Sequence, residues 1–299
     1  MTAAGLIDAH RSRGSFRDIG GEAVFVADLP ATDGPTGPPA LVVHGFPTSS
    51  IDWVGLLDRL RRHRRVVLLD LPGYGLSAKP DRHYGIFHSA DVVQAVAAEL
   101  DLHEVDLLTH DMGDTVGGEL LARDLDGSLG VAIRRRVVTN GSVYLGMASL
   151  TDGQQLLWNA PDEMLPEDGA PTADMLQLSL TMTMAPAGTP ASRPDPDHVR
   201  AAADLVVTDD GARLLPRLIR YLSDRTEHEA RFTGAIERHP APLAGVWGDL
   251  DPIAVYAMAE QLAERNLGAT LTRLEGVGHY PMLEAPDALA DAILAHLDA

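Results

Sequence analysis

The stretch from Val105 to Gly118 constrains the fold of this chain more than any other. It is typical of a short apolar strand, a sharp turn and the start of a helix, with Asp111 at the apex of the turn. Such a strained turn needs a small residue two positions after its apex, and Gly113 stands there. The N–H groups and the positive dipole end of the helix favour an ionised carboxylate at the apex. Asp111 is therefore a candidate nucleophile, although acidic residues are also common at ordinary strand–helix turns.

Strand and helix signals alternate on both sides of this turn. Continuous apolar runs predict strands buried on both faces at residues 40–44 and 66–70. Further strands are expected at residues 105–110, 131–139, 243–247 and 269–274. A hairpin around Gly20 and Gly21 precedes them. Ser49 or Ser50 is the expected N-cap of one helix, and Ser89 of the next. This alternation predicts a mostly parallel sheet with helices on both faces, in which ligands bind at the carboxyl ends of the strands.

The alternation stops between residues 144 and 240. This range has Met- and Leu-rich helical stretches and a loop rich in Pro, Gly and Ser, but no clear buried strand. We therefore predict an α/β core formed by residues 1–143 and 241–299, interrupted by a helical cap of residues 144–240. A cap in this place would cover the strand ends, exclude water and supply substrate contacts. The alternative is a second domain with a function of its own.

Composition excludes several classes of partner and cofactor. The 24 Lys and Arg against 43 Asp and Glu give a formal net charge of −19, which repels nucleic-acid phosphates and anionic membranes. The absence of cysteine excludes disulfides, Cys-ligated zinc and a Cys nucleophile. The histidines lack metal-site spacing, so we expect no metal and no cofactor. No segment resembles a signal peptide or a membrane span, which favours a soluble, cytoplasmic protein.

Three residues with catalytic chemistry fall at the ends of predicted core strands. Asp111 follows the strand at 105–110, Asp251 follows the strand at 243–247, and His279 follows the last strand. Each residue alone is a weak signal, because aspartates often form turns. Together they have the order of nucleophile, acid and histidine that a family of hydrolases places on such a sheet.

The matching motifs are His44-Gly45-Phe46-Pro47, Asp70-x-Pro72-Gly73-Tyr74-Gly75-x-Ser77, His110-Asp111-Met112-Gly113, Asp251-Pro252 and Gly278-His279. On these motifs the chain resembles the α/β-hydrolases of the epoxide hydrolase and haloalkane dehalogenase group. The runs at residues 109–116, 250–252 and 279–281 further resemble the mesoderm-specific-transcript branch of that group. The resemblance implies the α/β-hydrolase fold and covers the core on both sides of the cap, which itself matches weakly.

The resemblance also implies a cofactor-free mechanism. Asp111 would attack an electrophilic carbon and form an alkyl-enzyme ester. His279 would activate water to hydrolyse that ester, with Asp251 fixing the tautomer and orientation of the imidazole. The backbone N–H groups of Phe46 and Met112 would form the oxyanion hole.

The leaving group distinguishes the two activities in the group. Met112 and Phe46 stand where a dehalogenase carries Trp or Asn, and neither side chain can donate a hydrogen bond to halide. By resemblance, Tyr221 matches one of the two cap tyrosines that an epoxide hydrolase uses as acids, unless it only packs the cap. Tyr144 is a weaker candidate for the second tyrosine. Trp158 either reaches the substrate pocket or packs within the cap.

The favoured hypothesis is an epoxide hydrolase that converts a small apolar electrophile to a diol. The alternative enzyme is a haloalkane dehalogenase with unusual halide donors such as Trp158. A third hypothesis, from another class, is a non-catalytic ligand-binding protein on a hydrolase fold. A serine-type esterase is disfavoured because Asp111 occupies the apex. The sequence leaves the oligomeric state open, a homo-oligomer included.

Overall fold

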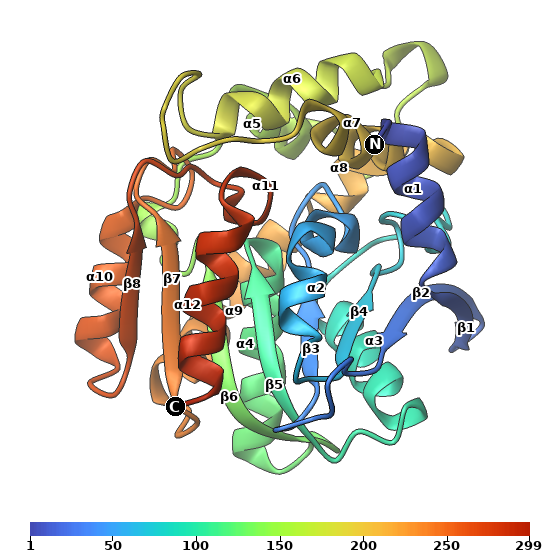
Figure 1. The fold of residues 1–299 in the computed structure, drawn as a ribbon. Coiled ribbons are helices and arrows are strands. Elements are labelled where there is room, and N and C mark those ends of the chain that lie inside the picture. Colours follow the sequence, from blue (N-terminus) through green and yellow to red (C-terminus); the bar gives the residue numbers. More distant parts are fainter.

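The computed structural model describes residues 1–299 and is built around an eight-stranded sheet (Figure 1). The strand order is β1-β2-β4-β3-β5-β6-β7-β8. The strands are β1 (Ser15–Ile19), β2 (Glu22–Leu29), β3 (Ala40–Val43), β4 (Val66–Leu69), β5 (Glu104–His110), β6 (Ala132–Thr139), β7 (Leu243–Gly248) and β8 (Thr270–Leu274). Only the β1–β2 and β2–β4 pairs are antiparallel. The predicted mostly parallel sheet is confirmed.

Helices cover both faces of the sheet (Figure 1). One layer consists of α3 (Ile86–Glu99), α4 (Met112–Asp126) and α9 (Tyr221–Arg238), which pack against one another. The other face carries η1 (Ser50–Leu56), α2 (Leu57–Leu60), α11 (Pro281–Glu284) and α12 (Pro286–Leu297), while α10 (Tyr256–Arg265) packs on β7 and β8. Every residue of β3, β4 and β7 is buried, as this double covering requires. No helix has the length and apolar composition needed to cross a membrane.

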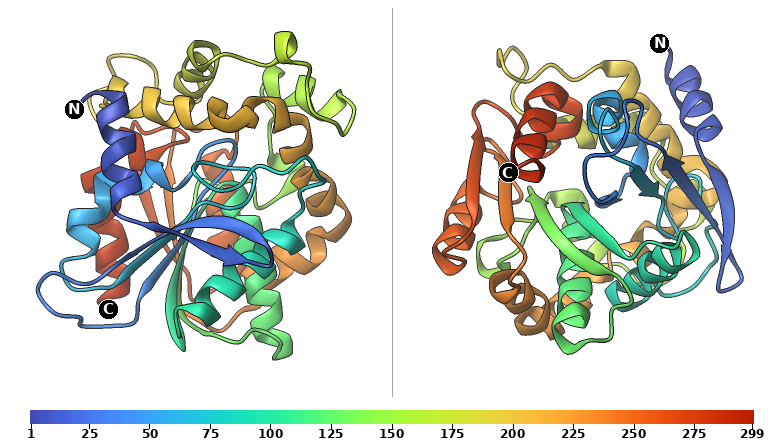
Figure 2. Two further views of the ribbon diagram at one scale, coloured as in Figure 1. Left: turned by 90° about the vertical axis from the view of Figure 1, so that its right-hand side faces the viewer. Right: turned by 60° about the horizontal axis from the view of Figure 1, so that its bottom comes forward.

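The segment between β6 and β7 is entirely helical or irregular. It contains η2 (Leu145–Met147), α5 (Asp152–Asn159), η3 (Glu167–Gly169), α6 (Ala173–Thr183), α7 (Pro196–Val207), η4 (Thr208–Leu214) and α8 (Leu215–Leu218) before it reaches α9. Helices α5 to α8 lie over the carboxyl ends of the strands (Figures 1 and 2). Helix α9 falls within the predicted cap range of 144–240, but it packs against α4 beside the sheet. The structural cap therefore ends before this range does.

Three local features differ from the sequence predictions. Helix α3 begins at Ile86, three residues before the predicted N-cap Ser89. The carboxylate of Asp224 in α9 accepts the Ile86 N–H at 2.7 Å and so takes the place of a local cap. The helix after Ser49 begins as the 3₁₀ helix η1, and the Ser49 side chain makes no capping hydrogen bond. A further helix, α1 (Ala3–Ser12), packs against α7 although its sequence is polar.

Candidate active site

Asp111 occupies a strained turn between β5 and α4. Its backbone has φ 51° and ψ −116°, a region that non-glycine residues rarely adopt. A Cβ atom on Gly113 would lie 2.5 Å from the Val43 carbonyl oxygen and 2.6 Å from that of His44. Only glycine fits at this position without moving the backbone of the neighbouring strand. The elbow expected from the sequence is therefore present, with the Asp111 side chain at its apex.

The two carboxylate oxygens of Asp111 have different surroundings. Oδ2 accepts a hydrogen bond from the Phe46 N–H at 2.9 Å. Met112 is the first residue of α4, directly after Asp111. Its N–H, the second predicted oxyanion-hole donor, therefore has no acceptor within the helix. Oδ1 lies 3.9 Å from His279 Nε2. One oxygen is thus held by the predicted oxyanion-hole donor, and the other faces the histidine.

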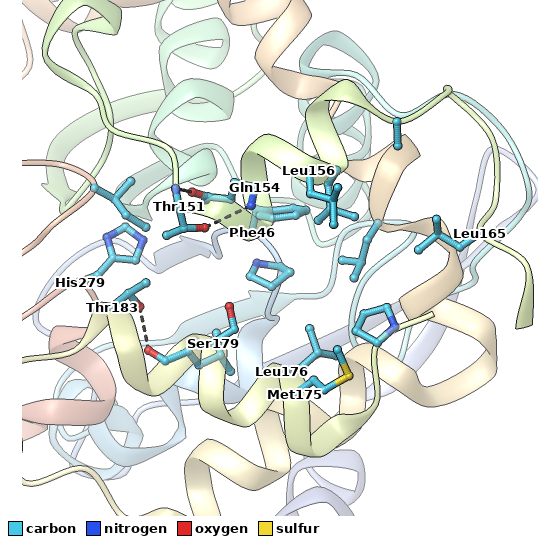
Figure 3. A pocket seen from close by; sticks show the side chains of 18 of the residues that line it. Phe46, Thr151, Gln154, Leu156, Leu165, Met175, Leu176, Ser179, Thr183 and His279 are labelled. Atoms are coloured by element: carbon cyan, nitrogen blue, oxygen red, sulfur yellow. Dashed lines mark hydrogen bonds between the residues drawn. The ribbon is translucent and has the colours of Figure 1, made fainter. Parts of the chain in front are cut away.

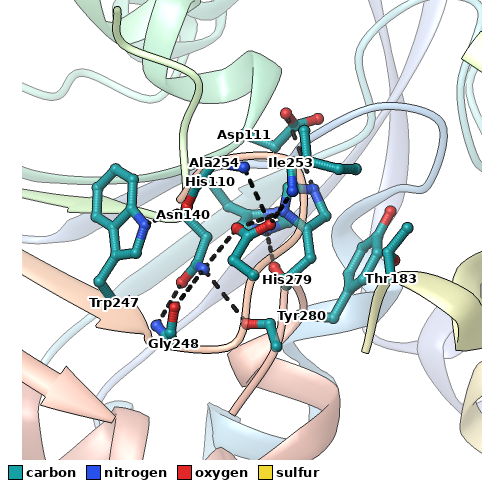
Figure 4. Close-up of polar contacts among 12 residues, drawn as sticks. His110, Asp111, Asn140, Thr183, Trp247, Gly248, Ile253, Ala254, His279 and Tyr280 are labelled. Carbon is teal, nitrogen blue, oxygen red and sulfur yellow. Dashed lines mark hydrogen bonds and ion pairs between the residues drawn. The ribbon is translucent and has the colours of Figure 1, made fainter. Parts of the chain in front are cut away.

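His279 is oriented by Asp251. The His279 Nδ1 lies 2.8 Å from Asp251 Oδ2, while Asp251 Oδ1 accepts the N–H groups of Ile253 at 2.7 Å and Ala254 at 3.0 Å (Figure 4). Asp111, Asp251 and His279 are all buried. The structure thus brings together the three residues that the sequence placed at separate strand ends. Because Nδ1 donates to Asp251, Nε2 is the nitrogen that faces Asp111.

Charge around His279 favours its protonated form. Burial opposes the imidazolium, but the carboxylates of Asp251 and Asp111 outweigh that effect and raise the pKa of His279 to about 9. The adjacent His110 behaves oppositely: burial and the charge of His279 lower its pKa to about 4. Neutral His110 therefore donates from Nε2 to the His279 carbonyl oxygen at 2.8 Å. At neutral pH the site holds one cation between two carboxylates.

A cavity of about 610 Å³ opens above His279, between the cap and the strand ends (Figure 3). Its lining includes Phe46, Leu156, Leu157, Leu165, Met175, Leu176, Leu180, Leu215, Ile253, His279 and Tyr280. His279 lies at one end of the cavity, and Leu165 and Met175 lie at the other (Figure 3). No Asp, Glu, Lys or Arg side chain lines it. Such a lining suits a neutral, elongated apolar molecule.

Comparison with known proteins identifies the family. Residues 40–292 match the family model described as "Alpha/beta hydrolase family". The chain belongs to the α/β-hydrolase family. The hydrolase is 38% identical over 277 residues to "Putative hydrolase LipZ" of Mycobacterium tuberculosis, covering 92% of each chain. It is 29% identical over 303 residues to the human "Mesoderm-specific transcript homolog protein", covering 97% of this chain and 87% of that one. The expected resemblance to the mesoderm-specific-transcript proteins is confirmed.

A third relative matches a smaller part of the hydrolase. The "Haloalkane dehalogenase" of Agrobacterium fabrum is 33% identical over 138 residues, which is 44% of this chain and 45% of that one. The expected similarity to the dehalogenase group is therefore also confirmed.

Asn140 is a site residue of the hydrolase that sequence reasoning missed. It follows β6 with a positive φ of 48°, and its Nδ2 donates to Asp251 Oδ2 at 2.7 Å (Figure 4). Its Oδ1 accepts the Gly248 N–H at 3.0 Å, and Nδ2 also lies 3.3 Å from the Gly278 carbonyl oxygen. One side chain therefore joins the end of β6 to the end of β7 and to the histidine loop. The only sequence signal was an Asn-Gly pair after a strand, which is typical of an ordinary turn.

Glu284 is a second site residue that sequence reasoning missed. This buried carboxylate accepts the N–H groups of Gly278 and Ala185, each at 2.9 Å. The His279 N–H donates to the Thr183 carbonyl oxygen at the end of α6, at 3.0 Å. The cap of the hydrolase is thus fastened directly to the loop that carries the histidine.

The three predicted substrate-binding residues lie in different surroundings. Tyr221 is buried with its ring centroid 5.8 Å from that of Phe46, and its hydroxyl makes no hydrogen bond within the chain. The Tyr144 hydroxyl donates to a glutamate of α9 at 3.0 Å, and the guanidinium of Arg220 lies 5.5 Å from the Trp158 ring centroid. None of Tyr144, Trp158 and Tyr221 lines the cavity. The structure brings only Tyr221 toward Asp111.

His44 and Asp70, both in motifs named above, hold the loops beside the site. His44 Nε2 accepts the Leu71 N–H at 3.0 Å, and Asp70 accepts the N–H groups of Ser50 at 2.9 Å and Leu76 at 2.7 Å. No group of three or more His, Cys, Asp or Glu side chains is arranged to hold a metal ion.

Proposed function

We propose that this hydrolase opens neutral, apolar epoxides to diols, with Asp111 as the nucleophile. The observation that carries the proposal is the environment of the Asp111 carboxylate. Oδ2 is fixed by the Phe46 N–H at 2.9 Å, and Oδ1 is directed toward the histidine and makes no hydrogen bond at 3.5 Å or less. A carboxylate held in this way is suited to displacement at an alkyl carbon, where it forms an ester.

In the first step Asp111 Oδ1 attacks one carbon of the epoxide. The C–O bond of the ring breaks, and its electron pair stays on the oxygen, which takes a proton from the Tyr221 hydroxyl. The products are a hydroxyalkyl ester of Asp111 and the Tyr221 phenolate. The phenolate is then reprotonated through solvent at the expense of the His279 imidazolium.

Loss of the Asp111 charge prepares His279 for the second step. Asp251 and Asp111 both raise the pKa of His279, so esterification of Asp111 removes one of these two charges and lowers that pKa. Neutral His279 takes a proton from water, and the hydroxide attacks the ester carbon. The Phe46 N–H stabilises the oxyanion. The diol leaves with the proton from His279, and the new Asp111 carboxyl group returns a proton to the histidine.

A haloalkane dehalogenase would use the same displacement, and the similarity to the Agrobacterium fabrum enzyme favours this second candidate. Two observations weigh against it. Phe46 and Met112 offer no side-chain donor to a departing halide, and Trp158 does not line the cavity. An epoxide needs a proton donor for its oxygen. We assign this role to Tyr221, which packs against the cavity residue Phe46 although it does not itself line the cavity.

Oxygen labelling tests the proposal. Enzyme in excess over styrene oxide would turn over once in water labelled with oxygen-18. We expect an unlabelled diol and one heavy oxygen in Asp111, because the first diol takes its oxygen from the carboxylate. Label in the diol after a single turnover would show direct attack by water and contradict the nucleophilic role of Asp111. Bromide released from 1-bromobutane, with no diol from epoxides, would favour the dehalogenase.

A further inference from the structure

Arg225 is a buried cation that the mechanism above leaves unused. It lies one turn after Tyr221 on α9, and only 3% of its surface is exposed. Its Nε and Nη1 groups are buried without a hydrogen-bond partner, and no carboxylate lies within ion-pair distance. Buried guanidinium groups are normally paired, because an uncompensated charge in the interior is costly. The buried charge of Arg225 must therefore be compensated by some other interaction.

The guanidinium of Arg225 lies over the ring of Tyr221. Its Cζ lies 5.6 Å from the centroid of the Tyr221 ring, in a cation–π arrangement. The Tyr221 ring also contacts Phe46, whose N–H holds Asp111. A continuous set of contacts thus leads from the guanidinium to the nucleophile.

Charges of opposite sign act on the Tyr221 hydroxyl. Burial raises the pKa of this phenol most strongly, Asp111 raises it further, and Arg225 lowers it. A phenol in such a place is a poor acid unless a cation stabilises its anion. Tyr144, the candidate for a second tyrosine, donates to a glutamate away from the cavity and cannot share this task.

We propose that Arg225 is a positioning residue that stabilises the Tyr221 phenolate formed while the epoxide opens. This inference rests on the proposed function. In the ring-opening step a proton leaves the Tyr221 hydroxyl, so negative charge appears on a buried ring beside the guanidinium. The cation over the ring supplies the stabilisation that a second hydrogen-bond donor to the epoxide oxygen would otherwise provide.

A double-mutant cycle tests it. The rate of Asp111 ester formation from styrene oxide is followed by intact-protein mass in the His279→Gln background, in which the ester accumulates. We expect Arg225→Met to slow esterification about tenfold, the equivalent of one pKa unit at Tyr221. Tyr221→Phe should slow it about a hundredfold. The double variant should match Tyr221→Phe alone, because Arg225 acts through the phenol. Arg225→Lys keeps the charge and should retain most of the rate.

Controls separate this role from packing. Arg82 lies over the ring of Tyr84 at 4.9 Å outside the cavity, so Arg82→Met removes a similar contact and should leave the esterification rate unchanged. The inference would be overturned if the losses in esterification rate were additive in the double variant. It would also be overturned if Arg225→Lys lost as much rate as Arg225→Met. If Arg225→Met does not fold, Arg225→Gln replaces it in the cycle. Esterification that depends on Tyr221 but not on Arg225 contradicts this inference alone, whereas no esterification by any epoxide contradicts the proposed function.

Discussion

The side-chain amide of Asn140 donates to Asp251 Oδ2 at 2.7 Å, on the same oxygen that lies 2.8 Å from His279 Nδ1. The other oxygen of Asp251 accepts the N–H groups of Ile253 and Ala254. The carboxylate is therefore fixed by four donors and cannot rotate without losing several of them. Asn140 therefore helps to orient His279 by holding Asp251.

Substitution of Asn140 should affect the second step more than the first. Asn140→Ala removes one donor from Asp251, so the histidine loses orientation and ester hydrolysis slows by about tenfold or more. Esterification of Asp111 does not need His279 as a base and should change little. Rapid-quench measurements of ester formation and decay separate the two rates. Asn266→Ala, which changes a partly exposed asparagine away from the site, is the matched control. A slower first step with unchanged hydrolysis would contradict this account.

Ester hydrolysis should increase with pH and then level off. The base must be neutral, and the pKa of His279 is about 9 while Asp111 carries its charge. In the ester that charge is gone, so the rate should reach its plateau through a pKa below 9. Asp251→Asn removes the other carboxylate and should move this pKa lower still, with a smaller plateau rate. Decay of the preformed ester at a series of pH values measures both quantities. A pKa that rises in Asp251→Asn would refute the assignment.

The stability of the fold should respond to pH through Asp52. Burial raises the pKa of this carboxyl to about 7, despite its 2.5 Å hydrogen bond from Thr48. The unfolded chain releases this proton near pH 4, so the folded state loses stability as pH rises from about 4 to 7, and the loss is complete above 7. Asp52→Asn should therefore stabilise the protein by roughly 1 to 4 kcal/mol at pH 8 and by little at pH 4. Urea unfolding at both pH values, with exposed Asp58→Asn as control, provides the measurement. Equal effects at both pH values would contradict the buried-acid explanation.

The cavity should discriminate by charge. Because no charged side chain lines it apart from His279, an epoxide with a carboxylate in its tail must lose hydration without gaining a partner. We expect its kcat/KM to be about a hundredfold lower than that of the uncharged amide analogue. Ser179 lies on α6 with its side chain along the cavity (Figure 3). Ser179→Lys should recover part of the loss for the carboxylate and none for the amide. Equal rates for both substrates in the unchanged enzyme would show that the tail does not occupy this cavity.

The elbow and the three strand-end residues could be predicted from the sequence because their signals are local. An apolar run followed by Asp111 and Gly113 defines a strand, a turn and a helix within a few residues. Parallel strands bring their carboxyl ends to the same edge, so Asp251 and His279 had to lie near Asp111 once the sheet was inferred.

The remaining features depend on contacts between distant segments. Helix α1 has few buried apolar side chains and is stabilised by packing against α7, so periodicity gave no sign of it. Asn140 and Glu284 are site residues only because three loops meet around them. The cap had the weakest pattern. The preference for Tyr221 over Tyr144 came from the resemblance, and no local signal indicated that Tyr221 contacts Phe46 whereas Tyr144 binds a glutamate of α9.

The central claim is that Asp111 forms an ester with the substrate, and the mass of the His279→Gln variant tests it most directly. After incubation with a panel of neutral epoxides, we predict a mass gain equal to one whole epoxide. Peptide mapping should place it on Asp111, and the Asp111→Asn/His279→Gln double variant should show none. A gain equal to an alkyl group, with halide released from a haloalkane panel, would replace the epoxide assignment. Diol production without a covalent adduct on Asp111, or an adduct on another residue, would contradict the account.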